Sequence, residues 1–482
     1  MRTARRSPGA TAWRPSGTSC ASRSRGRGFG PHPPIAPNAG NRPMIIILGA
    51  GLAGLSTAYH LRRAGCRAVT LHEREERPGG LCRSEARDGF TFDHTGHFLH
   101  LRTPEMTRLA GRLLGGELAT VVRSSWVWSQ GVFTRYPFQT NTYGLPIETV
   151  KEVLLGYIEA RYGKAPMPRA ACRAPRSFER WVYETFGAGI AKHFMIPYNE
   201  KLWGMHPRFL TTEWMGRYVP PAPIEKVIEG ALADKAAGEG YNATFRYPRA
   251  GGIETLVRAL AARAGPIRVG SEAVAIDPQR RRVEFADGSS SDYAALVSTL
   301  PLPELVARLK GAPDPVRNAA ARLRWASLFS LNLGLCHDAT DGRQWVYVPE
   351  RRFPFYRVGC FSNAAASMAP SGGAAVWSEV SYAPARPLDR SRVRRQILDG
   401  LREMGWLHRR RSVAVEWQLD IPFAYVIYDA HRRRATETIL HYLAKHEICS
   451  IGRYGRWEYS SMEDALLQGR ETAHRLLERH ET

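Results

Sequence analysis

The chain has 482 residues, of which 44% are hydrophobic and 23% are charged, which favours two or three globular domains and excludes a disordered, collagen-like or disulfide-stapled chain. No run of about 18 apolar residues is present, so we expect no membrane-spanning helix. The formal net charge of +23 comes mostly from arginines spread along the chain, a distribution that argues against nucleic-acid binding and favours small anionic ligands.

The first 43 residues differ in composition from the rest of the chain. They hold eight arginines and no acidic residue, are rich in Ser, Gly and Pro, and show no apolar periodicity. Such a segment cannot bury a core, so we expect residues 1–43 to be either a disordered leader or the product of a mis-assigned start. We favour Met44 as the true first residue, because a strand pattern begins there directly.

A strand, a glycine-rich turn, a helix and a second strand come next. Residues 44–48 are a fully apolar run that predicts a buried parallel strand, and residues 68–71 predict a second one. Between them, Gly49, Gly51 and Gly54 form a G-x-G-x-x-G motif ahead of a helical apolar pattern. The first glycine permits a tight turn, the second lets the backbone approach a pyrophosphate, and the third lets helix and strand pack closely. The sequence therefore predicts dinucleotide binding.

The residues after the second strand favour FAD over NAD as the dinucleotide. Glu73 lies 19 residues beyond Gly54, where an acid can accept a hydrogen bond from a ribose hydroxyl. Gly79 and Gly80 follow shortly, and a glycine pair lets the backbone contact a large flat ligand. An NAD domain would normally continue into its next crossover helix here, so NAD alone is the lesser alternative.

The remainder of the chain alternates helical and strand-like stretches. We expect helices over residues 147–162, 177–196, 251–264, 391–404, 435–445 and 463–478. We expect strands over residues 267–269, 273–277, 282–285, 293–299, 327–335, 344–348, 355–360 and 374–380. The predicted fold class is therefore α/β.

We expect three domains. A discontinuous Rossmann-type FAD-binding domain would consist of residues 44–118, 246–312 and 445–482. A helical substrate or flap domain would span residues 146–245. An antiparallel-sheet substrate domain would combine residues 119–145 and 313–444.

Five further motifs, well separated along the chain, resemble those of a known enzyme family. They are Tyr136-Pro-Phe-Gln139, Pro197-Tyr-Asn199-Glu-Lys201-Leu-Trp203, Asn242-Ala-Thr-Phe-Arg-Tyr-Pro248, Pro354-Phe-Tyr-Arg357 and Gly452-Arg453-Tyr-Gly-Arg-Trp457-Glu-Tyr459. Together with the FAD-type opening they resemble UDP-galactopyranose mutase, especially of the eukaryotic type, within the amine-oxidase and protoporphyrinogen-oxidase-like flavoproteins. The resemblance covers nearly all of residues 44–482.

The resemblance implies a redox-neutral isomerisation that nevertheless requires reduced FAD. In that family, flavin N5 attacks the anomeric carbon of UDP-galactopyranose, displaces UDP, and holds the sugar covalently while its ring opens and recloses as the furanose. It implies a nucleotide sugar as substrate, NAD(P)H as the candidate reductant, and a role of galactofuranose formation in cell-wall or polysaccharide biosynthesis.

The resemblance also implies roles for individual residues. A departing diphosphate carries developing negative charge, so the protein must supply guanidinium and phenol donors. The implied catalytic residues are Arg357, Arg453, His97, Tyr347, Tyr425 and Tyr459. The implied substrate contacts are Tyr136, Phe138, Gln139, Asn199, Trp203, Arg217, Asn242, Tyr347, Arg357, Tyr425, Arg453 and Tyr459. The implied cofactor contacts are Gly49, Gly51, Gly54, Glu73, Arg74, Gly79, Gly80, Leu81, Gly96, His97, Gly452, Tyr459 and Met462, with Arg123 and Ser125 near the flavin or a nicotinamide.

The sequence departs from the family pattern in three places. The mobile flap arginine of the eukaryotic enzymes is matched by Arg217 only after a one-residue shift. The loop before His97 reads His-Thr-Gly where the family usually shows Gly-Gly. The segment after Tyr459 also differs, and there Ser460 or Ser461 is expected to cap a helix that points at the pyrimidine edge of the flavin. The departures point to a bacterial relative and leave open another nucleotide sugar as substrate.

Two other functions remain open. The first is an FAD-dependent oxidoreductase of the amine-oxidase or protoporphyrinogen-oxidase type, which would need an apolar tunnel rather than convergent Arg and Tyr side chains. The second is a catalytically silent FAD-binding partner protein, which leaves Arg357, Arg453 and Asn242 unexplained.

Hydrolase chemistry and metal binding have no support in the sequence. It shows no Ser-His-Asp or metal-ligand spacing, so we expect no metal. The seven cysteines are scattered without a C-x-x-C pair, which favours a reducing, cytoplasmic setting. A homo-oligomer is a candidate assembly.

Overall fold

The computed structural model describes residues 44–163, 166–168, 177–216, 219, 221–234, 243–408 and 412–479. The expectation for residues 1–43 and the implied contacts Arg217 and Asn242 lie outside these described residues. Pro43–Thr482 clusters as one compact unit, and the fold below is that of this unit.

A five-stranded parallel sheet carries the glycine-rich motif. Its strand order is β19 (Ile448–Ser450), β13 (Ala295–Ser298), β1 (Ile45–Leu48), β2 (Val69–His72) and β9 (Ile267–Arg268). Each neighbouring pair runs parallel, and every residue of β1 and β13 is buried, as is usual for strands covered on both faces. The strands come from distant parts of the chain, so the discontinuous Rossmann-type sheet is confirmed.

Three helices cover this sheet near the glycine-rich turn. Helix α1 (Leu52–Arg63) joins β1 to β2, and α8 (Glu254–Ala264) and α14 (Met462–Glu478) pack against it. A Cβ atom on Gly469 of α14 would lie 2.6 Å from the carbonyl oxygen of Ala53. The two helices therefore touch through their backbones, which brings the chain's last helix beside its first.

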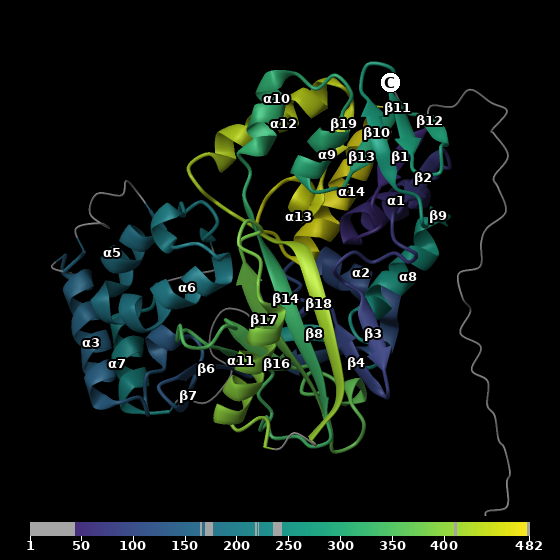
Figure 1. Cartoon of the computed structure of the whole chain (residues 1–482). Coiled ribbons are helices and arrows are strands. Elements are labelled where there is room, and N and C mark those ends of the chain that lie inside the picture. The colour runs from purple at the N-terminus through teal and green to yellow at the C-terminus, as the bar shows by residue number, and fades with distance from the viewer. Residues whose placement is uncertain are drawn as a thin grey trace, which may run out of the picture. The chain divides into compact units, whose positions relative to one another are not determined.

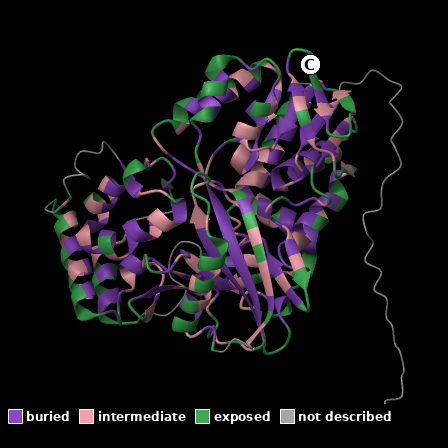
Figure 2. Ribbon diagram, viewed as in Figure 1, coloured by how far each residue is buried: buried purple, intermediate pink, exposed green. Residues whose placement is uncertain are grey.

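A seven-stranded sheet forms the second large layer. Its order is β18 (Val413–Val426), β14 (Trp325–Leu335), β17 (Ala374–Tyr382), β16 (Arg357–Cys360), β15 (Trp345–Tyr347), β6 (Ser125–Ser129) and β7 (Val132–Arg135). The pairs are antiparallel as expected, except that β15 and β6 run parallel and make the sheet mixed. Figure 2 shows β14 and β17 buried almost throughout, whereas the edge strand β18 alternates between buried and exposed residues.

The helical region lies beside the mixed sheet (Figure 1). It contains α3 (Ile147–Arg161), α5 (Phe178–Ile190), a π-helical turn (Ala191–Met195), α6 (Ile196–Trp203) and α7 (Ile224–Leu232). The single helix expected over residues 177–196 is interrupted at Gly187, whose φ of 75° is not helical. A Cβ there would lie 1.8 Å from the carbonyl oxygen of Gly156, so only glycine lets α5 approach α3 so closely.

Smaller elements connect these layers. They are β3 (Ser84–Arg87), β4 (Phe90–Asp93), α2 (Pro104–Leu114), β5 (Leu118–Val122), β8 (Thr244–Pro248), β10 (Ala273–Asp277), β11 (Arg282–Phe285), β12 (Ser290–Asp292), α9 (Leu302–Arg308), α10 (Asp314–Ala321), α11 (Arg390–Glu403), α12 (Arg432–Lys445) and α13 (Gly452–Gly455). The elements that the sequence predictions missed include the β3–β4 hairpin, whose strands are only four residues long, and the long strand β18. Strand β18 does carry hydrophobic residues at every second position from Val413 to Tyr425, so its pattern could have been recognised. The three domain boundaries stay a prediction.

Candidate active site

A cavity of about 1240 Å³ lies between the parallel sheet and the mixed sheet. Its lining comes from the carboxyl ends of β1 and β2, the segments 79–83 and 94–98, helix α6, and β14, β15, β16 and β18 of the mixed sheet. Typical pockets for one small ligand measure roughly 300–1,000 Å³. The cavity therefore has room for a large cofactor together with a second ligand.

Two glycine segments form a cradle at the parallel-sheet end of this cavity. Gly49 has a φ of 94°, and a Cβ atom there would lie 2.2 Å from the Thr299 hydroxyl oxygen. Gly51 and Gly80 face one another, because a Cβ on Gly80 would lie 3.4 Å from the Cα atom of Gly51. Helix α1 begins at Leu52 without a side-chain cap, so its first N–H groups are available to an anion. The cradle fits a dinucleotide pyrophosphate.

Gly54 acts differently from the other two glycines of the motif. It does not line the cavity, and a Cβ on it would lie 2.0 Å from the carbonyl oxygen of Gly49. This close approach is the helix–strand packing that the motif predicts for its third glycine.

Glu73 lies at the end of β2, where an acid was expected. Its carboxylate accepts hydrogen bonds from the backbone N–H groups of Ala50 at 2.7 Å and Glu75 at 3.1 Å. The side chain thereby connects the glycine turn to β2. Glu73 also lines the cavity, and the two hydrogen bonds fix the position of its carboxylate. Each carboxylate oxygen has further lone pairs for a ribose hydroxyl.

The start of α14 closes the cradle from the other side. The Ser461 side chain accepts a hydrogen bond from the N–H of Asp464, and the Asp464 carboxylate accepts one from the backbone N–H of Ser461 at 2.7 Å, which forms a capping box. The expected cap is therefore Ser461 and not Ser460. The cofactor contacts implied by resemblance that line the cavity here and beyond are Arg74, Gly79, Leu81, Gly96, Gly452 and Met462.

Arg357 and Glu379 form a buried ion pair on the opposite wall. Arg357 donates from Nε at 2.9 Å and from Nη2 at 3.0 Å to the Glu379 carboxylate, which is fully buried on the neighbouring strand β17. Although burial opposes the charged form, Glu379 raises the pKa of Arg357 well above its usual value. Tyr356 also donates to Glu379. The guanidinium is thus held rigidly, with its other N–H donors still available.

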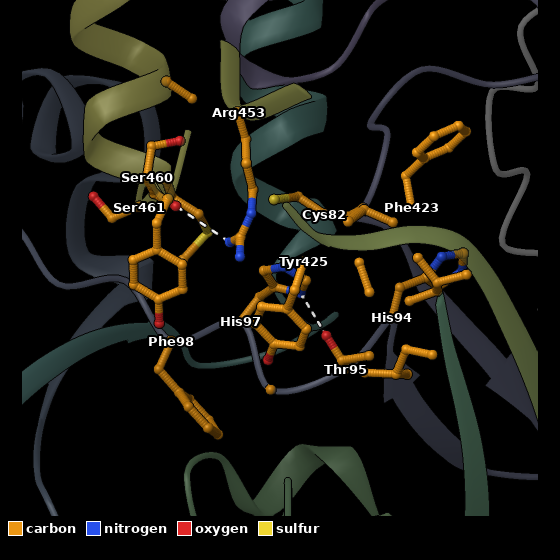
Figure 3. A pocket seen from close by; sticks show the side chains of 18 of the residues that line it. Cys82, His94, Thr95, His97, Phe98, Phe423, Tyr425, Arg453, Ser460 and Ser461 are labelled. Atoms are coloured by element: carbon orange, nitrogen blue, oxygen red, sulfur yellow. Dashed lines mark hydrogen bonds between the residues drawn. The ribbon is translucent and has the colours of Figure 1, made fainter. Parts of the chain in front are cut away.

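Arg453 approaches the same space from the parallel-sheet side. Its guanidinium carbon lies 5.2 Å from the ring centroid of Tyr425 and 4.9 Å from that of Tyr459. Nη1 donates to the carbonyl oxygen of Ser460 at 3.3 Å. Figure 3 shows the side chain extending from its helix toward the rings of Tyr425 and His97. Both expected arginines therefore line one cavity.

Tyrosines fill the space around the two arginines. Tyr347 lies between Tyr136 and Tyr198, with ring centroids at 4.5 Å and 5.5 Å. Burial raises the pKa of Tyr425 and of Tyr459, although the nearby arginines oppose that rise. Both phenols stay protonated at neutral pH. The Tyr425 hydroxyl donates to that of Tyr356 at 3.0 Å, because Tyr356 gives its own proton to Glu379.

His97 sits in the loop that follows β4. Burial and the positive charge of Arg453 lower its pKa to about 4, so the imidazole is neutral at physiological pH. Its Nδ1 atom lies 3.3 Å from the Thr95 hydroxyl (Figure 3). Thr95 has a φ of 73°, which a β-branched residue rarely adopts. In the UDP-galactopyranose mutases that the sequence resembles, this position is usually a glycine.

Two implied substrate contacts lie behind the cavity wall, whereas a third, Asn199, lines the cavity. Phe138 and Trp203 are fully buried and do not line the cavity. Phe138 stacks on Phe194 at 5.1 Å, and the Trp203 indole donates to the Asn199 amide oxygen at 3.1 Å. The Asn199 amide nitrogen in turn donates to the carbonyl oxygen of Met195, so that this amide is engaged within the helix. Phe138 and Trp203 therefore support the wall, whereas Asn199 is held in place by its two bonds and lines the cavity.

Several lining residues were not found by sequence reasoning. They are Cys82, His94, Phe194, Met195 and Tyr198. Tyr198 lies inside the Pro197-to-Trp203 motif and could have been found there. Phe194 and Met195 face the cavity from the π-helical turn, which no sequence pattern announces. Gln139, Arg123 and Ser125 line the cavity as the other members of the implied set.

Two classes of feature are absent from the part of the chain that the structure describes. No helix there is long and apolar enough to cross a membrane. Nor do those residues include a group of three or more His, Cys, Asp or Glu side chains arranged to hold a metal ion.

Comparisons with solved structures match the fold over most of the chain. A reduced UDP-galactopyranose mutase is 29% identical, with a TM-score of 0.84 over 91% of this chain and 94% of that chain. A structure described as a putative protoporphyrinogen oxidase from Exiguobacterium sp. 255-15 is 17% identical, with a TM-score of 0.68 over 90% and 99% of the two chains, and shows the fold alone. The resemblance to UDP-galactopyranose mutase is thus confirmed.

The sequence relatives match only short stretches of the chain, whereas a family model matches most of it. A phytoene dehydrogenase of Streptomyces griseus is 41% identical over 75 residues, and a 4,4'-diapolycopene oxygenase of Methylomonas sp is 43% identical over 56 residues. These matches span only 14% and 11% of the two relatives, and 16% and 12% of this chain. The model of flavin-containing amine oxidoreductases matches residues 52–477. The chain therefore belongs to the flavin-containing amine oxidoreductase family.

Proposed function

We propose that the protein is a flavin-dependent nucleotide-sugar mutase that interconverts UDP-galactopyranose, or a related UDP-hexopyranose, and its furanose form. The observation that carries the proposal is the convergence of Arg357, Arg453 and the surrounding tyrosines on the cavity that contains the glycine cradle. An oxidase for a bulky apolar substrate would instead need an apolar wall at this place. The 29% identity to a UDP-galactopyranose mutase supports the same assignment.

The two arginines would bind the diphosphate from opposite sides. Arg357 is held by its buried partner Glu379, so little side-chain entropy is lost when a phosphate binds to its remaining donors. Arg453 lies over the rings of Tyr425 and Tyr459, which hold the guanidinium plane. Fixed cations of this kind stabilise the negative charge that develops on the departing diphosphate.

The phenols of Tyr347, Tyr425 and Tyr459 would complete the binding of the diphosphate and the sugar. Tyr425 and Tyr459 remain protonated because burial raises their pKa values. Tyr459 would donate a hydrogen bond to an oxygen atom of the ligand, and Tyr425 would exchange its bond to the Tyr356 hydroxyl for one to the ligand. His97 remains neutral and adds no third cation that would hold the diphosphate too tightly for it to leave and return. We assign Tyr136, Gln139 and the nearby π-helical turn to the uridine part.

The glycine cradle, Glu73 and the uncapped start of α1 would hold FAD with its reactive ring toward these groups. When bound and reduced, FAD supplies the nucleophilic nitrogen that receives the anomeric carbon from the diphosphate. The surrounding protein keeps bulk water away from the sugar while it is separated from UDP.

The remaining parts of the proposal concern the cellular setting. We propose NAD(P)H as the reductant, with Arg123 and Ser125 beside it, a cytoplasmic location, and a product that enters cell-wall or polysaccharide biosynthesis. We also propose a homo-oligomeric assembly, which sedimentation of the purified protein would test.

The direct test is a panel of UDP-hexopyranoses incubated with purified, FAD-loaded protein. With dithionite-reduced enzyme, at least one pyranose is expected to convert to its furanose, as measured by chromatography and NMR of the product. Full turnover with oxidised flavin and no reductant would contradict the mutase proposal. Consumption of oxygen with an amine, and no furanose product, would establish the oxidoreductase alternative instead.

A further inference from the structure

The chain from Tyr428 to Arg432, between β18 and α12, lies behind the cavity wall. Tyr428 is buried, and neither Tyr428 nor Arg432 lines the cavity. Both residues nevertheless contact the turn Trp457–Tyr459, which carries one of the phenols assigned to the diphosphate. Tyr425, three residues earlier, does line the cavity, so the two nearby tyrosines have separate positions.

Two hydrogen bonds fix the turn that carries Tyr459. The Tyr428 hydroxyl accepts from the backbone N–H of Tyr459 at 2.7 Å. The Arg432 guanidinium donates to the carbonyl oxygen of Trp457 from Nε at 2.8 Å and from Nη2 at 2.5 Å. The guanidinium carbon also lies 4.0 Å from the centre of the Tyr428 ring. Arg432 and Tyr428 therefore form one stacked unit that holds two successive parts of the turn.

The turn needs an external support, because its backbone is strained. Trp457 is fully buried and has a φ of 53°, which a bulky side chain rarely adopts. Such a conformation lowers the free energy of unfolding and persists only when the surrounding structure imposes it. Arg432 holds the carbonyl group of that strained residue, and Tyr428 holds the backbone N–H two residues after it.

The same unit also holds a third segment, which covers the Tyr459 ring. The N–H of Thr211 donates to the carbonyl oxygen of Tyr428 at 2.6 Å, and the Glu213 carboxylate lies 3.8 Å from Arg432. Trp214, next along this segment, packs against the ring of Tyr459 with centroids 6.1 Å apart. The backbone and the ring of Tyr459 are therefore both located by contacts that lead to Tyr428 and Arg432.

We propose that Tyr428 and Arg432 are positioning residues for Tyr459, and through its ring for Arg453, and that they set the affinity for a nucleoside diphosphate without touching it. This inference rests on the proposed function, because it assigns Tyr459 and Arg453 to the diphosphate. The ring of Tyr459 lies 4.9 Å from the Arg453 guanidinium, so a shift of the turn displaces both donors together. Displacements of about 1 Å in such sites can cost roughly a hundredfold in rate.

The test uses Tyr428→Phe, which removes only the hydroxyl that accepts from Tyr459. The matched control is Tyr293→Phe, because Tyr293 is also buried and its hydroxyl has no hydrogen-bond partner among the described residues. UDP binding to the FAD-loaded proteins is measured by calorimetry, and kcat and KM are measured with the sugar nucleotide that the wild type converts. Tyr428→Phe should weaken UDP binding about tenfold and lower kcat, at unchanged flavin content. Tyr293→Phe should bind UDP as the wild type does.

A second pair of variants separates positioning from loss of fold. Arg432→Met should reproduce the weaker UDP binding, and Arg432→Lys should restore part of it, because an ammonium can still donate to Trp457. Hydrogen exchange at the Tyr459 amide should accelerate in Tyr428→Phe, which reports the turn without any ligand. Unchanged UDP affinity together with faster exchange at this amide would overturn the inference. Failure of the wild type to bind UDP would instead overturn the proposed function.

Discussion

The two ends of the cavity are built in different ways. The cofactor cradle consists of Gly49, Gly51 and Gly80 with Glu73, all within a short stretch of sequence, and it works mainly through backbone atoms. The opposite wall draws its side chains from β15, β16, β18 and α6, which are far apart in the chain. Backbone sites tolerate few substitutions, whereas a side-chain wall can change its ligand while the fold persists. This difference explains why the family shares a flavin and not a substrate.

The largest effect is expected at Gly54, which packs directly behind the cradle. A tolerated Gly54→Val substitution would contradict the view that the cradle depends on its backbone. Its Cβ atom would lie 2.0 Å from the Gly49 carbonyl oxygen, and neither backbone can move without disrupting β1. We expect a loss of folding stability on the order of 5 kcal/mol, seen as insoluble or flavin-free protein. Gly111→Ala, which meets open space in α2, is the control and should remain soluble and yellow.

On the opposite wall, Arg357→Met should destabilise the fold through its partner. It leaves the fully buried Glu379 carboxylate without its cation, a change that typically costs about 3–5 kcal/mol. Adding Glu379→Gln removes that charge, so the double variant should recover part of the lost stability in urea denaturation. A single variant as stable as the wild type would show that Glu379 does not depend on Arg357.

Because of His97, the folding stability of the protein should fall as the pH is lowered below 6.5. Its folded-state pKa is about 4, against 6.5 in the unfolded chain, so the unfolded state takes up a proton first as the pH falls below 6.5. This residue therefore stabilises the fold fully above pH 6.5 and loses that contribution between pH 6.5 and 4, at about 1.4 kcal/mol per pH unit. His97→Gln cannot titrate, so its stability deficit relative to the wild type should shrink by roughly 2 kcal/mol between pH 7 and pH 5. An equal deficit at both values would mean that His97 is not neutral in the folded protein.

The smallest effect is expected at Gly51, where a substitution tests whether the cradle binds the pyrophosphate of FAD. Gly51 has a backbone conformation that alanine adopts without strain, and a Cβ atom there would lie 4.0 Å from its nearest neighbour, the Cα atom of Gly80. Gly51→Ala should therefore fold normally. Its methyl group enters the space between α1 and Gly80, where the pyrophosphate is expected. We predict about a tenfold weaker affinity for FAD at an unchanged unfolding midpoint, measured by titrating the flavin-free protein. Full flavin affinity would place the cofactor elsewhere.

The cradle was predictable from sequence because its signals are local. The spacing of Gly49, Gly51 and Gly54 and the acid at the end of the next strand all refer to one strand–turn–helix–strand unit, which the structure confirms. The pocket-lining positions of Arg357 and Arg453 also agreed with the family resemblance.

The supports of the wall were not predictable in the same way. Glu379, Tyr428 and Arg432 act through contacts between segments that only the folded chain brings together, and no motif marks them. Phe138 and Trp203 were expected to touch substrate, yet they pack behind the wall, because a motif shows that a residue belongs near a site and not which way its side chain faces.

The central claim is that one cavity holds a flavin and a diphosphate side by side. It is tested most directly by titrating UDP into the FAD-loaded protein while following the flavin absorbance, with wild type and Arg453→Met compared. The account predicts one UDP bound per flavin, a shift of the flavin spectrum on binding, and an affinity at least about tenfold weaker in Arg453→Met. UDP binding that leaves the flavin spectrum unchanged, or that is indifferent to Arg453, would contradict it.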